Sequence, residues 1–521
     1  MEITARPARG FIRTALVAAA LCSGALLAGF ITLWQPGLSV AGVTLTLLPI
    51  VVALYFSRPR WALITFVLLL PLHSFLITLL IAQVGLSLSL GRAIAAWKEL
   101  LLVGTFFAVI VQALVRGRIP RPVWLDAIAA AWLGLVLLHF GFSLVFRPAV
   151  PVVALAYGAR DWMLYLLPYF VGRLVVFNER YFEKVLTAIA AIGVLTSAFG
   201  IVEYFFIPTS WWISFGVPYY FGTFLGLVYP DYLGGLPPNF WAEVAGNAVR
   251  RAVSTHLSGQ GFALPFLIIL PVVLCRYLRR PAWANLAWVG ICGLGLLLSI
   301  TRMTIIACGI QVVLLLWLYP RRSWLLIAMA LVGMLLLGGL VGNSRFREFV
   351  VDTVTLSDTS GGARPAQWAV GLRDLVTYPL GRGLGFSGQV GARFGQGGVG
   401  SEAGYFKITG DLGLPGLLLF LAWFSGVLFY AWRLIHRREG AWRQLGLIGF
   451  VAAVGFLVNN LTAPPDQSPF TIYVFAWLAG LTVRVAAASP FVPTPQAEPA
   501  PILPLLVRAD EAAGSAALLR S

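Results

Sequence analysis

The chain has 521 residues, of which 59% are hydrophobic and 11% are charged, and its formal net charge is +17. Soluble domains carry about 25% charged residues, so this composition excludes a soluble globular protein and indicates an integral membrane protein. Because Lys and Arg gather in the cytoplasmic connections of membrane proteins, the positive charge indicates topology signals rather than a nucleic-acid partner.

Apolar runs of about 20 residues recur along the chain and predict an all-α, polytopic membrane protein with about 12–14 transmembrane helices. Arg6, Arg9 and Arg13 precede the first run, which lacks a clear cleavage site, so we expect an uncleaved first helix. Residues 83–98 contain several charges and are interpreted as an interfacial segment. The expected spans are 13–33, 41–56, 61–82, 99–115, 124–146, 161–177, 184–206, 259–277, 283–300, 303–319, 324–342, 408–432, 443–461 and 470–487.

Basic residues recur in every second connection, which predicts a cytoplasmic side that includes both termini. On the opposite, outer side two connections are long. The chain is therefore divided into N-terminal helices (1–206), a first outer loop (207–258), central helices (259–342), a second outer loop with short helices (343–407), C-terminal helices (408–487) and a disordered, Pro- and Ala-rich cytoplasmic tail (488–521).

The first outer loop is crowded with aromatic side chains, which two interpretations explain. They form an interfacial belt at headgroup depth, or a platform that stacks sugars or guides an acyl chain. Both interpretations stay open at this stage. The residues are Trp211, Trp212, Phe215, Tyr219, Tyr220, Phe221, Phe224, Tyr229, Tyr232, Phe240 and Trp241.

Arginines on the outer side are informative because the positive-inside rule does not explain them. Several lie where an outer loop meets a helix end, at a depth where an arginine must be paired or must face a polar cavity. A local ion pair, such as Arg160 with Asp161, is one explanation. Several arginines at one membrane face would instead form an anion site, since guanidinium groups match phosphate oxygens. The candidates for substrate binding are Arg160, Arg251, Arg302, Arg373 and Arg382, together with Arg364.

Two residues are candidates for proton transfer. Glu402 lies just before a helix in a glycine-rich stretch, where the helix dipole alone would also favour a negative charge. His256 follows Arg251 by five positions, and it could equally be a hydrogen-bonded residue at a helix end.

Other patterns carry no chemistry. Gly383, Gly385 and Gly388 match GxGxxG, but no strand precedes them, so we interpret them as a flexible turn region or a lid. The four cysteines lie in apolar runs without metal-ligand spacing. No metal and no cofactor are expected.

Four segments resemble the O-antigen ligase/polymerase superfamily of polytopic bacterial enzymes. They are GARDWMLYLLPYFVGR, VRRAVSTHLSGQGFALPFLIILP, LLLSITRMTIIACGI, and RPAQWAVGLRDLVTYPLGRGLG followed by SEAGYFKITGDLGLPGLLLF. The resemblance implies that Arg160, Arg251, Arg302 and Arg364 bind a pyrophosphate. It also implies that Glu402 occupies the place of the catalytic histidine that ligases typically carry. Arg364 and His256 complete the set of catalytic candidates.

The resemblance implies a metal-independent glycosyltransferase in the bacterial cytoplasmic (inner) membrane. Its substrates would be an undecaprenyl-pyrophosphate-linked glycan and an acceptor glycan or lipid A core, and it would act as a ligase or a polymerase. A transporter or flippase without catalytic activity is the alternative. An enzyme using a polyprenyl monophosphate sugar is disfavoured because the first short outer loop, WQPGLSVAG, carries no charge.

Overall fold

The computed structural model describes residues 60–115, 119–147, 150–175, 178–227, 229–244, 247–319, 347, 351, 359–394, 403–464 and 468–488. The spans expected at 13–33, 41–56 and 324–342 lie outside the described residues, as do the tail after 488 and Glu402. Within the described residues the protein is an all-α membrane protein with a single two-stranded hairpin, which confirms the predicted fold class.

Eight helical segments in the described part of the chain are long and apolar enough to cross a membrane. They are Trp61–Gln83, Leu88–Leu114, Trp124–Phe146, Glu179–Phe206, Gly259–Arg279, Gly404–Arg437, Gly440–Asn459 and Pro469–Ala487.

The longer helices make up most of the bundle. In chain order they are α3 (Arg60–Leu69), α6 (Trp97–Val115), α7 (Trp124–Phe146), α8 (Val152–Leu174), α9 (Glu179–Phe206), α13 (Phe266–Arg279), α14 (Trp283–Leu298), α15 (Arg302–Leu318), α18 (Thr359–Thr377), α20 (Gly404–Arg437), α21 (Gly440–Asn459) and α22 (Pro469–Ala487).

Short elements fill the connections. They are η2 (Leu70–Leu72), α4 (His73–Thr78), η3 (Leu79–Gln83), α5 (Leu88–Ala95), α10 (Thr209–Ser214), α11 (Val217–Tyr219), η4 (Tyr220–Phe224), η5 (Asp231–Leu233), η6 (Pro238–Phe240), β1 (Trp241–Val244), β2 (Asn247–Arg250), η7 (Ser254–His256), α12 (Gly259–Ala263) and α19 (Gly388–Arg393).

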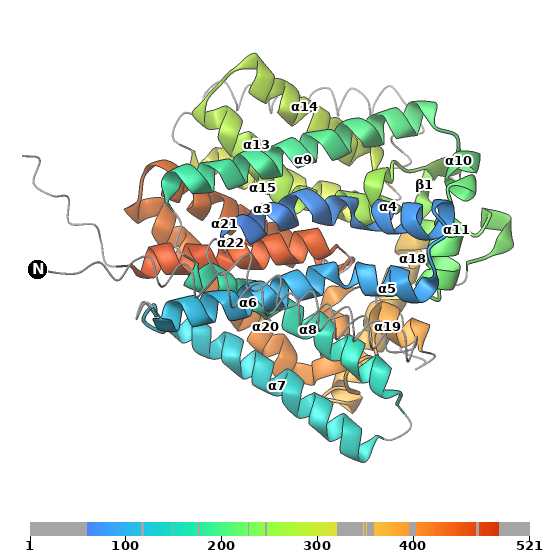
Figure 1. Ribbon diagram of the computed structural model, residues 1–521, viewed down its shortest axis with the longest axis horizontal. Coiled ribbons are helices and arrows are strands. Elements are labelled where there is room, and N and C mark those ends of the chain that lie inside the picture. The colour runs from blue at the N-terminus through green and yellow to red at the C-terminus, as the bar shows by residue number, and fades with distance from the viewer. Residues whose placement is uncertain are drawn as a thin grey trace, which may run out of the picture. The chain divides into compact units, whose positions relative to one another are not determined.

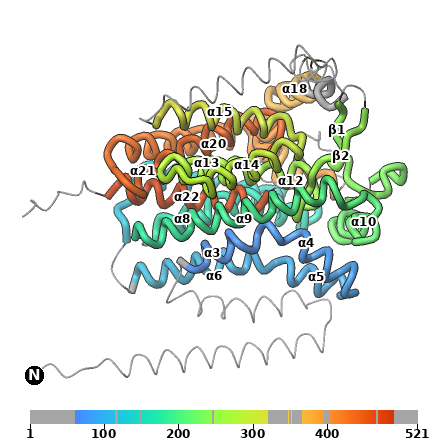
Figure 2. Tube along the Cα trace, turned by 90° about the horizontal axis from the view of Figure 1, so that it is seen from above, coloured from blue at the N-terminus to red at the C-terminus, as the bar shows by residue number. Residues whose placement is uncertain are grey.

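The long helices from α6 to α15 run alternately in opposite directions, so their connections fall at two ends of the bundle (Figure 1). One end carries α10, the β1–β2 hairpin and α18, which lie together in Figure 2, and we call it the loop end. The other end carries the basic connections, such as the Arg276–Arg280 stretch and Arg437, and we call it the basic end.

The helix α22 is central and α7 is peripheral. In the most apolar window of each, 83% of the α22 residues are buried but only 22% of the α7 residues. Glycines let α22 approach α8 closely, since a Cβ on Gly172 would lie 2.9 Å from the backbone nitrogen of Leu481. Small residues at such crossings are typical of packed membrane helices.

Two helix boundaries differ most from the prediction. Residues 88–95 form α5 and lead into α6 within one candidate span, so the interfacial segment expected at 83–98 is largely part of a spanning helix. Ser87 caps this helix by accepting from the backbone N–H of Leu90. The helix α8 begins at Val152 instead of residue 161, because Arg160 and Asp161 are paired inside the helix.

Most aromatic residues of the first outer loop form a small core of their own. Trp212, Phe215, Tyr220, Phe224 and Phe240 are buried in one cluster, against which Trp211, Phe221 and Trp241 pack. The five buried side chains therefore serve as the core of this loop. Tyr232 remains exposed.

A partly buried carboxylate joins α7 to α8 at the basic end. Asp126 accepts hydrogen bonds from Arg173 Nε at 2.8 Å, Arg173 Nη2 at 2.7 Å and Tyr169 OH at 2.6 Å. It also accepts from the backbone N–H of Val123, which caps the start of α7. The Arg173 side chain is only 4% exposed, so it depends on this partner.

We expect Asp126→Ala to lower the free energy of unfolding by about 3–5 kcal/mol, because it leaves the buried Arg173 guanidinium without its counter-ion. Denaturation of the purified protein in detergent measures this change. Asp231→Ala, which removes an exposed acid in η5, is the control and should shift stability by less than about 0.5 kcal/mol. Equal stability of the two variants would contradict the role of Asp126.

Candidate active site

Arg160 lies on α8 and pairs with the next residue along the helix. Its Nη2 is 2.8 Å from Asp161 Oδ1, and its Nη1 is 3.6 Å from Glu99 Oε1 on α6. The guanidinium also lies over the Tyr157 ring, which Arg393 of α19 approaches as well. The local ion pair is therefore present, while 40% of the Arg160 side chain stays exposed to a further ligand.

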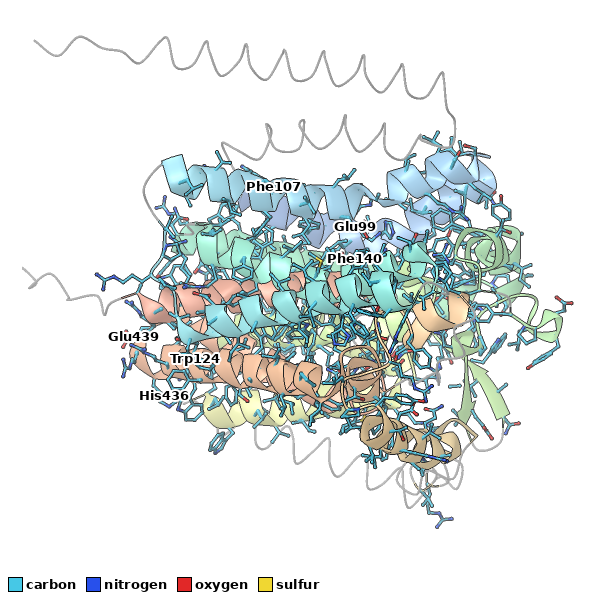
Figure 3. The ribbon with its side chains drawn as sticks, turned by 90° about the horizontal axis from the view of Figure 1, so that it is seen from below. Glu99, Phe107, Trp124, Phe140, His436 and Glu439 are labelled. Carbon is cyan, nitrogen blue, oxygen red and sulfur yellow. The ribbon has the colours of Figure 1, made fainter. Side chains whose placement is uncertain are left out.

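Two buried lysines extend this group. Lys98 Nζ is 3.4 Å from Glu99 Oε1, and Lys407 Nζ of α20 is 3.7 Å from Asp161 Oδ2. Figure 3 shows Glu99 among the helices, nearer the loop end than Phe107 of the same helix. Charges inside a membrane protein are costly unless they are paired, and they mark functional positions. We call these residues the central ion cluster: Lys98, Glu99, Arg160, Asp161 and Lys407.

Asp411, one helical turn after Lys407, joins three parts of the chain. Its Oδ2 accepts from Trp162 Nε1 of α8 at 2.9 Å, and its Oδ1 accepts from the backbone N–H of Ser387 at 2.9 Å. The residue is 1% exposed. Two residues later the helix breaks at Gly413, whose φ of 68° and ψ of −165° are not helical. Asp411 thus holds α20 and α8 against residues 381–388, which we call the glycine spacer.

The glycine spacer is a turn region, as expected, and it is packed tightly against α8. A Cβ on Gly158 of α8 would lie 2.9 Å from Gly385 Cα, which leaves room only for backbone. Gly385 has a φ of +73°, a conformation that side-chain-bearing residues rarely adopt. The backbone N–H of Leu414 donates to the Pro379 carbonyl at 2.8 Å and closes α20 against the spacer.

The segments that carry Arg251 and Arg302 contact each other at the loop end, in what we call the arginine corner. Arg302 Nη2 donates to the Glu243 carbonyl of β1 at 2.6 Å. Thr301 Oγ1 donates to the Gly259 carbonyl at 3.3 Å, and a Cβ on Gly259 would lie 2.6 Å from Arg251 Cδ. Thr301, which directly precedes the arginine, therefore ties the α14–α15 turn to the segment that carries Arg251.

The turn before Arg302 has an unusual backbone. Ile300 has a φ of 47°, the left-handed region that a β-branched residue rarely occupies. The Ile300 N–H still donates to the Leu297 carbonyl at 3.1 Å, and Ser299 and Thr301 are buried on either side. The strained turn ends α14 and aims the first residue of α15 at the β1–β2 hairpin.

Hydrogen bonds connect the arginine corner to the start of α20. Thr304 Oγ1 of α15 donates to Asn459 Oδ1 at 2.9 Å, and the Gly404 N–H donates to the Asn460 carbonyl at 2.9 Å. Glu402 stands two positions before Gly404 but lies outside the described residues. Arg364 falls within α18, and its side chain is likewise outside them.

His256 has two buried ring nitrogens without hydrogen-bond partners. Part of the residue is exposed, but neither ring nitrogen is, and neither has a hydrogen-bond partner among the described side and main chains. The ring lies 5.9 Å from that of Phe262. Burial lowers the pKa of His256 to about 3, so the ring is neutral at physiological pH. The expectation of a hydrogen-bonded histidine at a helix end is wrong.

The remaining candidates belong to α18 and the spacer. Arg373 is exposed on α18. Arg382 Nη2 donates to Asp374 Oδ1 at 2.6 Å, and its guanidinium lies over the rings of Tyr378 and Phe386. No contact described here joins these two arginines to the arginine corner or to the central ion cluster.

Arg250, another arginine at the loop end, has a structural partner. It forms an ion pair with Glu203 of α9, which is fully buried. The same carboxylate accepts from the backbone N–H groups of Val253 and Ser254 and from Trp212 Nε1. Glu203 therefore fixes the loop that leads from β2 to η7.

The sequence analysis missed Lys407 and Asp411. The signal was a lysine and an aspartate four positions apart, hence on one face of an apolar helix. The prediction considered the arginines and omitted both of these residues. No group of three or more His, Cys, Asp or Glu in the described ranges could hold a metal ion.

Residues 287–421 match the model of the O-antigen ligase family. The matched range runs from α14 into α20 and contains Arg302, Lys407 and Asp411. The match covers part of the chain and supports its relation to the O-antigen ligase-related superfamily. A comparison with curated proteins finds no match.

The family match confirms the resemblance and makes this a multi-pass bacterial membrane protein of the O-antigen ligase/polymerase type. Members are glycosyltransferase-like proteins whose partners are lipid-linked glycans and membrane lipids. Arg160, Arg251 and His256 lie outside the matched range, so their place in the site rests on the contacts above.

We expect Asp411→Ala to lower the free energy of unfolding by about 3–5 kcal/mol, since the buried donors Trp162 Nε1 and Ser387 N–H lose their acceptor. Asp411→Asn keeps an acceptor oxygen and should cost less. Chemical denaturation followed by tryptophan fluorescence checks both values. An alanine variant as stable as the wild-type protein would show that the spacer does not depend on Asp411.

Acid should destabilise the wild-type protein more than His256→Phe. Because the folded state keeps His256 neutral, the unfolded chain alone takes up a proton below its pKa of about 6.5. Stability from this residue is therefore complete above pH 6.5 and falls by up to about 1.4 kcal/mol per pH unit below it. Unfolding at pH 7.5 and pH 4.5 measures the difference, and parallel losses in both proteins would contradict it.

Proposed function

We propose that this protein transfers or polymerises a glycan from an undecaprenyl-pyrophosphate carrier at the outer face of the cytoplasmic membrane. The observation that carries the proposal is the arginine corner, where the segments of Arg251 and Arg302 contact each other at the end of the bundle opposite the basic connections. Positive-inside topology does not account for arginines there. The family match over residues 287–421 supports the same class of substrate.

The arginines would act on the leaving group. During transfer the bond between the anomeric carbon and the phosphate oxygen breaks, and the pyrophosphate leaves with the bonding electrons. Guanidinium groups at the arginine corner, with Arg364 and Arg160, would stabilise that charge without a metal ion. The charge-assisted hydrogen bonds involved are worth about 1.5–3 kcal/mol each.

Glu402 would serve as the base. The acceptor hydroxyl, on lipid A core or on another lipid-linked repeat, forms the new bond to the anomeric carbon and gives its proton to the Glu402 carboxylate. Gly404, two positions later, is held by Asn460 near the α15 end that carries Arg302, which supports a role for this stretch beside the arginine corner. His256, neutral and unpartnered, would contact the sugar rather than take the proton.

A transporter or flippase without catalytic activity is the second candidate. The break of α20 at Gly413 and the paired charges of the central ion cluster favour it, because transporters place broken helices and buried charges at their substrate sites. The two candidates differ in their product: only the transferase makes a new glycosidic bond.

Glu402→Gln should reduce glycan transfer by about 100-fold or more, because it removes a general base. Arg364→Lys should also reduce transfer, since lysine lacks the planar fork that matches phosphate. The assay uses purified protein in detergent micelles with an undecaprenyl-pyrophosphate-linked glycan and a glycan acceptor, and it measures the transferred product.

Asp231→Asn in the first outer loop is the matched control and should retain full transfer. If both site variants keep wild-type transfer, the proposed mechanism is wrong. If the wild-type protein makes no product in micelles but moves a labelled lipid-linked glycan across proteoliposomes, the protein is a flippase.

A further inference from the structure

A cavity of about 270 Å³ opens at the loop end, between α7, the start of α8 and the chain that joins α18 to α19. Its polar lining comes from Ser143, Arg147 and Arg382, and its aromatic lining from Tyr378 and Phe386. The central ion cluster and the arginine corner contribute none of its lining residues. The cavity is therefore a separate site from the proposed active site.

Arg147 brings a guanidinium that has no acceptor. Its backbone N–H donates to the Ser143 carbonyl at the end of α7, but its side chain makes no hydrogen bond or ion pair with the described residues. Gly383 packs directly on it, since a Cβ there would lie 2.6 Å from Arg147 Nη1. The side chain is half-buried, so water does not surround the guanidinium completely.

Arg382 has a side-chain N–H donor without an acceptor. Its Nη2 donates to Asp374, but its Nε–H is buried and has no acceptor in the described part of the chain. The cavity is thus bordered by two guanidinium groups, only one of which is paired with a carboxylate. Buried donors without acceptors are rare. An oxyanion in the cavity would give the Arg147 guanidinium an acceptor beside the charge of Arg382, because guanidinium groups match phosphate oxygens in geometry as well as charge.

The surroundings of the cavity indicate where the oxyanion comes from. Phe146 at the end of α7 is 67% exposed and Val152 at the start of α8 is 59% exposed. Leu380, in the chain between α18 and α19, is 68% exposed. The helix α7 is also the least buried of the eight candidate spans, and Figure 1 shows it at the edge of the bundle. A ligand that follows α7 to the cavity therefore travels along apolar surface.

We propose that this cavity binds the phosphate headgroup of a lipid whose chains lie along α7. Arg147 and Arg382 hold the phosphate oxygens, and the exposed apolar residues of α7 and α8 contact the chains. The site lies at the end of a spanning helix, which is the depth of lipid headgroups. It binds without glycan chemistry, so the inference is independent of the proposed transferase activity.

The test measures lipid binding to purified full-length protein by native mass spectrometry. The probes are dioleoyl phosphatidic acid, dioleoylglycerol, which has the same chains without the phosphate, and inorganic phosphate. We expect phosphatidic acid to bind, dioleoylglycerol to bind at least about tenfold more weakly, and inorganic phosphate not to compete at equal concentration.

Arg147→Gln should weaken phosphatidic acid binding by about tenfold or more and leave dioleoylglycerol binding unchanged. Arg147→Lys should fall between the two, since it keeps the charge but loses the fork. Arg280→Gln, an exposed arginine at the basic end, is the matched control and should bind like the wild-type protein.

Two results would overturn the proposal. Equal binding by Arg147→Gln and Arg280→Gln would show that the cavity is not the lipid site. Displacement of phosphatidic acid by inorganic phosphate at equal concentration would assign the site to a soluble anion. Unfolding measurements on each variant establish that a loss of binding is not a loss of folding.

Discussion

The loop end of this protein depends on the buried carboxylate of Asp411. It accepts from the Trp162 indole and from the Ser387 backbone, and so connects α20, α8 and the glycine spacer in one place. The spacer can reach that position because Gly158 and Gly385 let two backbones touch. The cavity beside Arg147, the ion pair of Lys407 with Asp161 and the break in α20 all follow from this contact.

Charged residues are distributed in this bundle as pairs that join elements. Asp126 with Arg173 fixes α7 to α8 at the basic end, and Glu203 with Arg250 fixes α9 to the hairpin at the loop end. Burying each pair costs free energy, and removing one partner is strongly destabilising. Because the helices have similar apolar surfaces, the pairs help to select one arrangement among them. Against this background Arg147 and Arg382, whose side-chain donors are not all filled, are the arginines that suggest a ligand.

Part of the candidate site could be predicted from sequence, because some interactions are local. Arg160 and Asp161 are neighbours in the chain, and their ion pair was foreseeable. The link between Arg251 and Arg302 was not, because it passes through Gly259 and Thr301, which belong to segments that only folding brings together. Lys407 went unnoticed for the same reason: its partner Asp161 lies on another helix.

The glycine spacer and the aromatic loop show the limit most clearly. A glycine-rich segment suggests conformational flexibility, yet these glycines are required for close packing. Which role a glycine has depends on the atoms that its backbone contacts in the folded protein. By itself the sequence determined the membrane-spanning helices, their alternating ends and the superfamily, because hydrophobic length, charge bias and family motifs are properties of continuous segments. Only the tertiary structure decided which arginines are paired, which are open, and which aromatic rings are buried, because each of these depends on a partner far away in the chain.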